Sequence, residues 1–494
     1  MNKKALAALA LVVLFSGAIS FSLLTRGHSW LDDFASYVMQ AKSILDGTMG
    51  EFVQRNAFTV TESSYPPGPA AYPWGFPLLL APIYAVFGMH ALAFKLLNTL
   101  FYALFLLAFF ALARTRLGNV ESILLTAALA FNPALLLAHD YIISDIPFLF
   151  FCTLGLFLAD AFNRPNSTSL PPNTQRNTGA KTLFLGIATG IAIFAAAFIR
   201  TNGILLLIPL ALGHLLQLWP QRHLDWKPTL TPYLIFGLLF ALQAVSFPNG
   251  QDSYLSHFSM FTLQSLWDNF TYYLWLPSWM FREFGGELLY PLLMIFVIIS
   301  VVSHGKRNLP LNVYSLSTVV LYILWPERQG LRFIYPILPL LLLFAFDGAK
   351  LLVARLQSGW QRPAQVALMA FWVALMAVSV GVSANAAREN LSASRAINGP
   401  FDPISGEMFE FLREKTPPES VVVFFRPRAL RLFTDRDTFM TEYCADLPKG
   451  DYLALSKKVD DNGQIPPDEV GACLQTTLEQ VFSNRRFVVY RIIP

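Results

Sequence analysis

The chain has 494 residues, of which 54% are hydrophobic and only 14% are charged, and its mean hydropathy is +0.47. Soluble domains usually carry about 25% charged residues, so this composition excludes a large soluble protein and indicates one that lies in a membrane. The net charge of +4 excludes a strongly basic nucleic-acid surface, and three cysteines are too few for a dense disulfide framework.

The chain begins with two lysines and an apolar stretch from Ala5 to Leu24. This pattern resembles a secretory signal, but the stretch is long for one and further apolar runs follow it. We therefore expect a retained first membrane helix, with Lys3 and Lys4 in the cytoplasm because basic residues favour that side.

Further apolar runs come close to the roughly 20 residues that cross a bilayer. They lie at 90–112, 120–138, 146–162, 182–199, 204–219, 230–247, 288–303, 311–325, 333–347 and 365–385. The run at 76–88 is too short to cross and contains two prolines, so it predicts an interfacial helix. About eleven spans result, and on this count Lys and Arg cluster in the cytoplasmic segments.

Two polar regions stand out from this apolar chain. The first outer loop, 25–89, is acidic and aromatic, and from about residue 390 the charge density becomes that of a globular protein. We expect a transmembrane domain at 1–388 and an extracytoplasmic α/β domain at 389–494. Cys444 and Cys473 lie in the second domain, where either a disulfide or two free thiols fits the sequence.

Two adjacent acids, Asp32 and Asp33, precede an amphipathic helix expected over 31–47. Acids at this position can cap a helix and complement its dipole, which is the purely structural interpretation. The functional interpretation is that one carboxylate acts as a general base, while the other orients it or helps to hold a cation.

Other charges lie at the outer ends of predicted spans, where a charge marks a site or reaches to the interface. Asp145, Arg200 and Arg332 all map to the face that holds the acid pair. Guanidinium groups bind phosphate bidentately, and they would stabilise the charge of a departing phosphate. The set therefore favours a lipid-linked phosphate or diphosphate donor, whose tail would lie in a groove between the spans.

Motifs of soluble enzymes are absent: we find no glycine-rich phosphate loop, no paired zinc spacing and no nucleophile elbow. His257, in an aromatic outer segment, could share a metal ion with the acids or serve as an interfacial structural residue. The sequence leaves both roles open.

Several segments resemble, in order and spacing, the multi-spanning C-type (GT-C) glycosyltransferases, the group of protein O-mannosyltransferases and lipid A aminoarabinose transferases. The resemblance extends over about residues 1–345. The segments are LDDFASYVMQAKSILDG, YPPGPAAYPWGFPLLLAPIYAVFG, KLLNTLFYAL with ARTRLG, ISDIPFLF, IRTNGILLLIP and LRFIYPILPLL.

The resemblance implies a polyprenyl-phosphate sugar as donor and Asp32 as the base. Asp33 stands where the family often has Glu, which leaves its role, including any contact with a divalent metal, open. By resemblance Arg200, Arg332 and Lys95 would bind the donor phosphate. Further site candidates are Tyr37, Asp145 and Arg328.

The sequence thus predicts a polytopic α-helical membrane protein with a GT-C-like bundle, interfacial helices in the first outer loop and a small C-terminal α/β domain. It would transfer a hexose or pentose to a hydroxyl of a protein, lipid or glycan. Without the large additional luminal domain of the eukaryotic O-mannosyltransferases, a bacterial inner-membrane enzyme is expected.

The sequence leaves two alternative functions open. One is a transporter or lipid-carrier flippase, which would show mid-membrane charges and often a repeat. The other is a non-catalytic scaffold.

Overall fold

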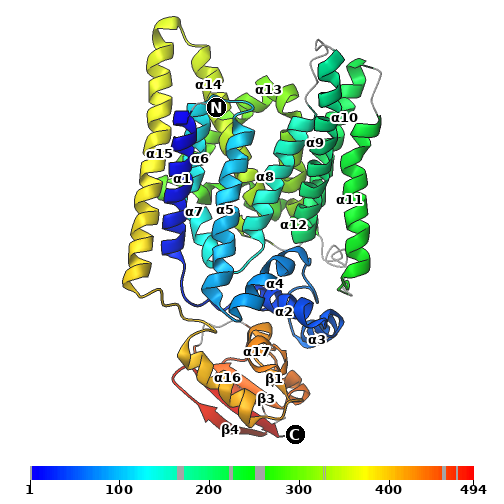
Figure 1. The fold of residues 1–494 in the computed structure, drawn as a ribbon. Coiled ribbons are helices and arrows are strands. Elements are labelled where there is room, and N and C mark those ends of the chain that lie inside the picture. Colours follow the sequence, from blue (N-terminus) through cyan, green and yellow to red (C-terminus); the bar gives the residue numbers. More distant parts are fainter. Residues whose placement is uncertain are drawn as a thin grey trace.

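The structure is a computed structural model that describes residues 3–163, 172–221, 226–250, 262–325, 328, 330–458, 463–473 and 477–493. A helical bundle forms most of the molecule, and a small sheet domain lies at one end of it (Figure 1). The N-terminus lies at the far end of the bundle and the C-terminus in the sheet domain. We call the end of the bundle that contacts the sheet domain the domain face.

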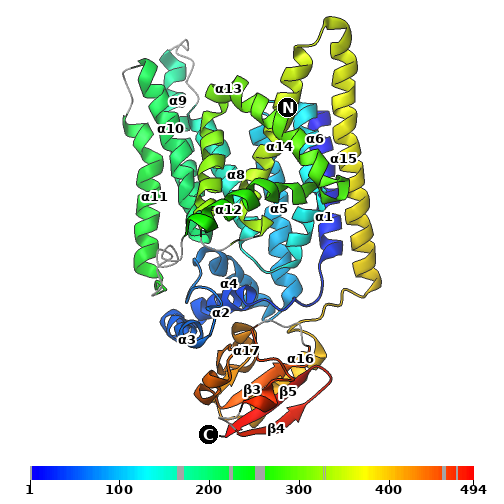
Figure 2. The same ribbon diagram turned by 180° about the vertical axis from the view of Figure 1, so that it is seen from behind.

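The bundle is built from long apolar helices. Its helical elements are α1 (Lys3–Leu23), α5 (Ala91–Ala113), α6 (Asn119–Ala130), α7 (Pro133–Leu136), η1 (Leu137–Asp140), α8 (Asp145–Phe162), α9 (Pro172–Ile199), η2 (Thr201–Leu206), α10 (Leu207–Gln221), α11 (Trp226–Ser246), α12 (Leu263–Trp275), η4 (Leu276–Phe284), α13 (Gly286–Ile323), η5 (Leu331–Ile337), α14 (Leu338–Ala354) and α15 (Ser358–Ser392). Figure 2 shows α12 lying across the bundle rather than along it.

Among the described residues, eight helices are long and apolar enough to cross a membrane. The number is nine if α6 and the segment Pro133–Asp140, which are inclined at 56° to each other, together form one bent span. An integral membrane protein of mostly helical fold is therefore confirmed, whereas the count of eleven spans stays a prediction.

The nine possible spans and the eleven expected runs differ at two places. The runs expected at 288–303 and 311–325 both lie in the element α13, which consists of two helices that meet at a kink at His304, where the backbone angles are non-helical. Arg307 follows this kink and donates to Asp347 of α14 at 3.2 Å. The run expected at 204–219 is divided between η2 and α10, and its apolar part, Thr201–Leu216, is one of the shorter helices.

Three short helices lie between α1 and α5 at the domain face (Figure 1): α2 (Asp33–Asp46), α3 (Met49–Glu62) and α4 (Gly75–Phe87). In α2, Phe34, Val38 and Ala41 recur at helical spacing and are completely buried. Thirteen residues make α4 too short to cross a bilayer. The interfacial helices expected in the first outer loop are therefore present.

The sheet domain contains α16 (Pro403–Lys415), α17 (Pro427–Thr434) and five strands in the order β2-β1-β3-β5-β4. The strands are β1 (Val421–Val423), β2 (Asp437–Phe439), β3 (Tyr452–Ser456), β4 (Thr477–Ser483) and β5 (Phe487–Ile493). The strand β1 is parallel to both neighbours, whereas β5 is antiparallel to β3 and β4. A disulfide joins Cys444 to Cys473.

The sheet domain packs directly on the first outer loop. Trp30, just before α2, inserts its ring among aromatic residues of the domain core, including Phe409 and Phe425. On α3, Arg55 forms ion pairs with Asp435 at 2.8 Å and with Asp437 at 2.9 Å. The loop and the domain therefore form one packed unit at the end of the bundle.

Candidate functional site

A cavity of about 660 Å³ lies where the bundle, the first outer loop and the sheet domain meet. Acids and arginines from distant parts of the chain line it: Asp32, Asp33, Asp145, Arg200, Arg332 and Arg426. Its other walls include the segment 65–73, η2 and the end of α13. The cavity thus combines charged groups with apolar helix ends, as a site for an amphipathic molecule requires.

Asp32 precedes α2, yet its side chain accepts no capping hydrogen bond from that helix. Its Oδ1 instead accepts from the backbone N–H of Ala429 in α17, at 3.3 Å. Burial raises the pKa of the Asp32 carboxyl to about 6, although the nearby charges of Arg428 and Arg426 act in the opposite direction. A carboxylate with a pKa close to neutral is well suited to take up a proton as a general base.

Asp33 is held by two partners from other elements. The hydroxyl of Tyr72 donates to its Oδ1 at 2.7 Å, and Arg332 donates to its Oδ2 at 3.2 Å. Burial raises the pKa of Tyr72 well above its usual range, so the phenol keeps its proton and acts as a donor. Both oxygens of Asp33 therefore have partners, whereas among the described residues the Asp32 side chain accepts one long hydrogen bond, from a backbone amide.

The two predicted arginines both lie close to the ring of Phe333. The guanidinium carbon of Arg200 is 4.5 Å from the centroid of Phe333, and that of Arg332 is 5.2 Å from it. Arg200 precedes η2 and forms an ion pair with Asp145, the first residue of α8. Tyr37 of α2 also lines the cavity and shares a hydrogen bond of 3.1 Å with Ser144.

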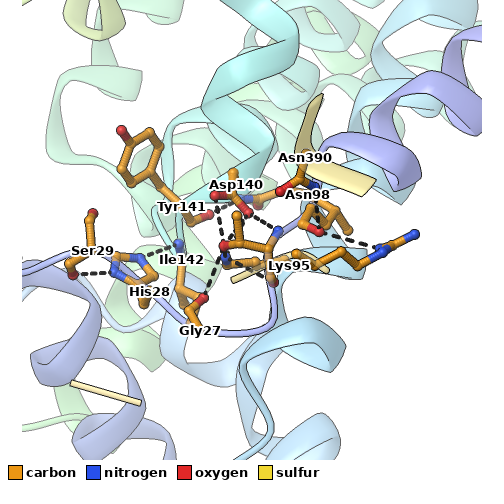
Figure 3. A network of polar contacts seen from close by, with 12 residues as sticks. Gly27, His28, Ser29, Lys95, Asn98, Asp140, Tyr141, Ile142 and Asn390 are labelled. Carbon is orange, nitrogen blue, oxygen red and sulfur yellow. Dashed lines mark hydrogen bonds and ion pairs between the residues drawn. The ribbon is translucent and has the colours of Figure 1, made fainter. Parts of the chain in front are cut away.

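Lys95 does not line the cavity. Its ammonium group is fully buried on α5 and donates to Asp140 at 2.6 Å and to the Thr25 hydroxyl at 2.7 Å. Figure 3 shows this group in a polar network with His28 and the end of η1. The network joins the end of α1 to α5 and to the segment before α8, so the geometry favours a structural role for Lys95 over phosphate binding.

Two further candidates from the sequence, Arg328 and His257, are not among the described residues that line the cavity. Arg328 is exposed and lies 3.7 Å from Asp268 of α12, outside the lining. His257 falls outside the described residues. Within the described ranges, no group of three or more His, Cys, Asp or Glu side chains is arranged to hold a metal ion.

Sequence reasoning missed the contribution of the sheet domain to this cavity. Arg426 and Met440 belong to that domain and line the cavity beside the acid pair. The three arginines of RPRALRLF mark the segment as unusual, but the local pattern predicts only a short helix. Its position against α2 comes from packing between segments nearly 400 residues apart.

The sequence profile of the dolichyl-phosphate-mannose-protein mannosyltransferase family matches residues 72–262. No curated protein sequence matches the chain significantly. The fold resembles ArnT from Cupriavidus metallidurans bound to undecaprenyl phosphate, with a TM-score of 0.60 and 14% identity over 99% of this chain and 98% of that one.

The fold also resembles the oligosaccharyltransferase of Archaeoglobus fulgidus tethered to an acceptor peptide, with a TM-score of 0.53 and 12% identity over 98% of this chain and 74% of that one. A structure of the archaeal oligosaccharyltransferase AglB with dolichol-phosphate gives a TM-score of 0.52 and 11% identity, over 92% and 70%. These findings confirm the resemblance expected from the sequence.

Proposed function

We propose that this chain, which has the fold of the multi-spanning C-type glycosyltransferases, transfers a sugar from a polyprenyl-phosphate donor to an acceptor hydroxyl on the extracytoplasmic face. The observation that carries the proposal is that Asp32 shares one cavity with Arg200 and Arg332. The structural neighbours bound to undecaprenyl phosphate and dolichol-phosphate support a lipid phosphate as the group that these arginines bind.

The donor phosphate would lie beside Phe333, between the guanidinium groups of Arg200 and Arg332. Planar guanidinium groups bind phosphate oxygens through paired hydrogen bonds. The phosphate would compete with Asp145 and Asp33, the present carboxylate partners of these arginines. The lipid tail would run between the apolar helix ends.

In the transfer step, the acceptor oxygen attacks the anomeric carbon of the sugar as Asp32 removes the proton of the acceptor hydroxyl. The bond between the anomeric carbon and the phosphate oxygen breaks, and the electron pair leaves with the phosphate. Arg200 and Arg332 stabilise the charge that develops there. The products are the glycosylated acceptor, the polyprenyl phosphate and a proton on Asp32, which passes to solvent.

Asp33 would act through position rather than by proton transfer. Its oxygens accept from Tyr72 and Arg332, so it links the segment 65–73 to η5. We assign it to the orientation of Arg332 and of the loop around Asp32.

The proposed orientation places the domain face outside. Basic residues lie at the opposite end of the bundle, near the end of α5 and in the turn between α14 and α15, and these include Arg114, Arg116 and Arg355. Basic segments favour the cytoplasm, and the disulfide of the sheet domain suits an oxidising compartment. We propose a bacterial inner-membrane enzyme, with 1–388 as the transmembrane domain and 389–494 as the extracytoplasmic domain.

Transfer is tested with the purified protein and defined polyprenyl-phosphate sugars. The wild type should consume a donor and release polyprenyl phosphate, and Asp32→Asn should abolish this because the amide cannot act as a base. Asp46→Asn is the matched control, since it removes the same charge at the exposed end of the same helix.

Substantial activity in Asp32→Asn would remove this residue as the base. A flippase would give a different result, because it would move the donor across a liposome membrane without consuming it. Donor loss that depends on Asp32 therefore distinguishes the two functions.

A further inference from the structure

Arg428 of α17 is a fully buried arginine, and among the described residues the hydrogen bonds of its side chain all go to the first outer loop. Its Nη1 donates to the carbonyl of Pro67 at 3.0 Å and its Nη2 to that of Pro69 at 2.6 Å. Its Nε donates to the side-chain oxygen of Asn56 on α3 at 3.1 Å. A buried charge is costly unless it is well bonded, and here the bonding partners belong to the first outer loop.

The two carbonyls lie in the segment Tyr-Pro-Pro-Gly-Pro-Ala-Ala-Tyr-Pro at 65–73, which we call the proline strap. The strap forms a wall of the cavity. Proline has no N–H, so four of its nine residues cannot donate a backbone hydrogen bond. Its carbonyls therefore depend on external donors, and a planar guanidinium can satisfy two of them at once.

The strap leads directly to the acid pair. Tyr72, near its end, donates to Asp33, and the guanidinium carbon of Arg428 lies 5.6 Å from the centroid of the Tyr72 ring. The residue after Arg428 is Ala429, whose N–H contacts Asp32. The beginning of α17 thus reaches Asp32 directly and Asp33 through the strap.

We propose that Arg428 is a positioning residue for sugar transfer: by fixing the proline strap and the start of α17, it holds Asp32 and Asp33 in the geometry of the reaction. The sheet domain is then a part of the catalytic machinery and not an appended module. This inference rests on the proposed function, because it concerns the same acid pair.

Docking of the sheet domain does not depend on Arg428 alone. The ion pairs of Arg55 and the insertion of Trp30 into the domain core also hold the domain on the loop. Loss of the guanidinium should therefore disturb the strap and the acids while the domain stays in place.

The charge of Arg428 also affects the pKa of Asp32, and this effect can be measured separately from the positioning of the strap. The charged groups that act on Asp32 are Arg428 and Arg426 from the sheet domain and Asp33 on its own helix. A positive charge lowers the pKa of a neighbouring carboxyl. Removal of the Arg428 charge should therefore raise the pKa of Asp32, whereas a lysine at this position should keep much of the electrostatic effect.

The experiment compares Arg428→Met and Arg428→Lys in the full-length protein, with donor turnover measured as a function of pH. Both variants should lower kcat by about tenfold or more, because small displacements of reacting groups cost that much, and the KM for the donor should change little. Since Asp32 acts in its ionised form, the acidic limb of the rate profile should move to higher pH in Arg428→Met and stay near its wild-type position in Arg428→Lys.

Arg436→Met is the matched control. Arg436 is also a buried arginine that donates to backbone carbonyls, but its partners, Arg413, Thr416 and Thr434, all lie within the sheet domain. The Arg436→Met variant should lower the thermal midpoint as Arg428→Met does. Its kcat and pH profile should remain close to those of the wild type.

Equal kcat and equal pH profiles in Arg428→Met and Arg436→Met would overturn the inference. If Arg428→Met does not fold, Asn56→Ala removes one partner of the guanidinium and also the amide that donates to the carbonyl of Ala70 in the strap, without changing a residue of the cavity lining. An unchanged kcat in that variant would also overturn the inference. A wild type that consumes no polyprenyl-phosphate sugar would instead overturn the proposed function, and the inference with it.

Discussion

At the scale of single residues, the site depends on the difference between two adjacent carboxylates. Asp33 accepts hydrogen bonds from Tyr72 and Arg332. In the part of the chain that the structure describes, the Asp32 side chain accepts only from the amide of Ala429, and burial raises its pKa to about 6. Asp33 is therefore suited to hold its neighbours in position, and Asp32 to exchange a proton.

The raised pKa of Asp32 has a consequence for stability. The ordinary pKa of Asp is 3.8, so the folded protein holds this proton more tightly than the unfolded chain does. This contribution to the free energy of unfolding is present below pH 3.8 and is lost as the pH rises through about 6. At pH 7, Asp32→Asn should thus have a thermal midpoint at least as high as that of the wild type, although it is inactive. A clearly lower midpoint in a melting experiment would contradict the burial of an ionised Asp32.

Arg332 should act mainly in donor binding. Arg332→Ala removes charge-assisted hydrogen bonds to phosphate, each worth about 1.5–3 kcal/mol, so the KM for the donor should rise by about tenfold or more. Arg328→Ala is the control, since this arginine also follows α13 but lies outside the cavity lining. Steady-state kinetics with varied donor would argue against the phosphate contact if the two variants had the same KM.

Most charged residues around the acid pair could be predicted from the sequence, because they lie at the ends of apolar runs. Asp145, Arg200 and Arg332 are of this kind, and the structure brings them together in the cavity. Lys95 fits the same pattern but pairs with Asp140 inside the bundle. The sequence alone does not show that pairing, because it depends on how α5 and η1 pack.

At the scale of elements, the length and composition of a helix determine whether it can cross the membrane. The helix α4 is apolar, but its 13 residues keep it at the domain face, where it packs on α2. The element α13 bends at His304, just before Lys306 and Arg307, so the break that the sequence predicts between two apolar runs is present as a kink.

The proline strap is the element most sensitive to a small change. Gly68 has φ +126°, and a Cβ at this position would lie 2.6 Å from the Tyr72 hydroxyl and 3.1 Å from Nη1 of Arg428. We expect Gly68→Ala to displace Tyr72 from Asp33 and to lower sugar transfer by about tenfold or more.

Gly88→Ala separates backbone strain from this contact. Gly88 also has a positive φ, +61°, but a Cβ there would meet no atom within 4 Å. This variant should lower the thermal midpoint and keep transfer activity near that of the wild type. Equal activities in the two alanine variants would show that the strap does not control the acid pair.

At the scale of the whole molecule, the membrane fold could be predicted from hydropathy, whereas the docking of the sheet domain could not. The contacts of Trp30, Arg55 and Arg428 with their partners join segments more than 350 residues apart. Such contacts leave no local pattern in the sequence.

The proposed orientation is tested by labelling single introduced cysteines with a membrane-impermeant maleimide in spheroplasts. Glu410→Cys on α16 should react from outside, and Gln357→Cys before α15 should react only after permeabilisation, since both positions are exposed. The native thiols should contribute little, because Cys152 is buried and the other two cysteines are bonded. The opposite pattern would place the cavity in the cytoplasm.

The central claim is that the cavity binds the phosphate of a polyprenyl carrier beside Asp32. The most direct measurement is an experimental structure of the protein with a bound polyprenyl phosphate. We predict that the phosphate lies within hydrogen-bond distance of both Arg200 and Arg332, with the lipid tail between the apolar helix ends. A phosphate bound at Lys95, at Arg328 or elsewhere outside this cavity would contradict the account.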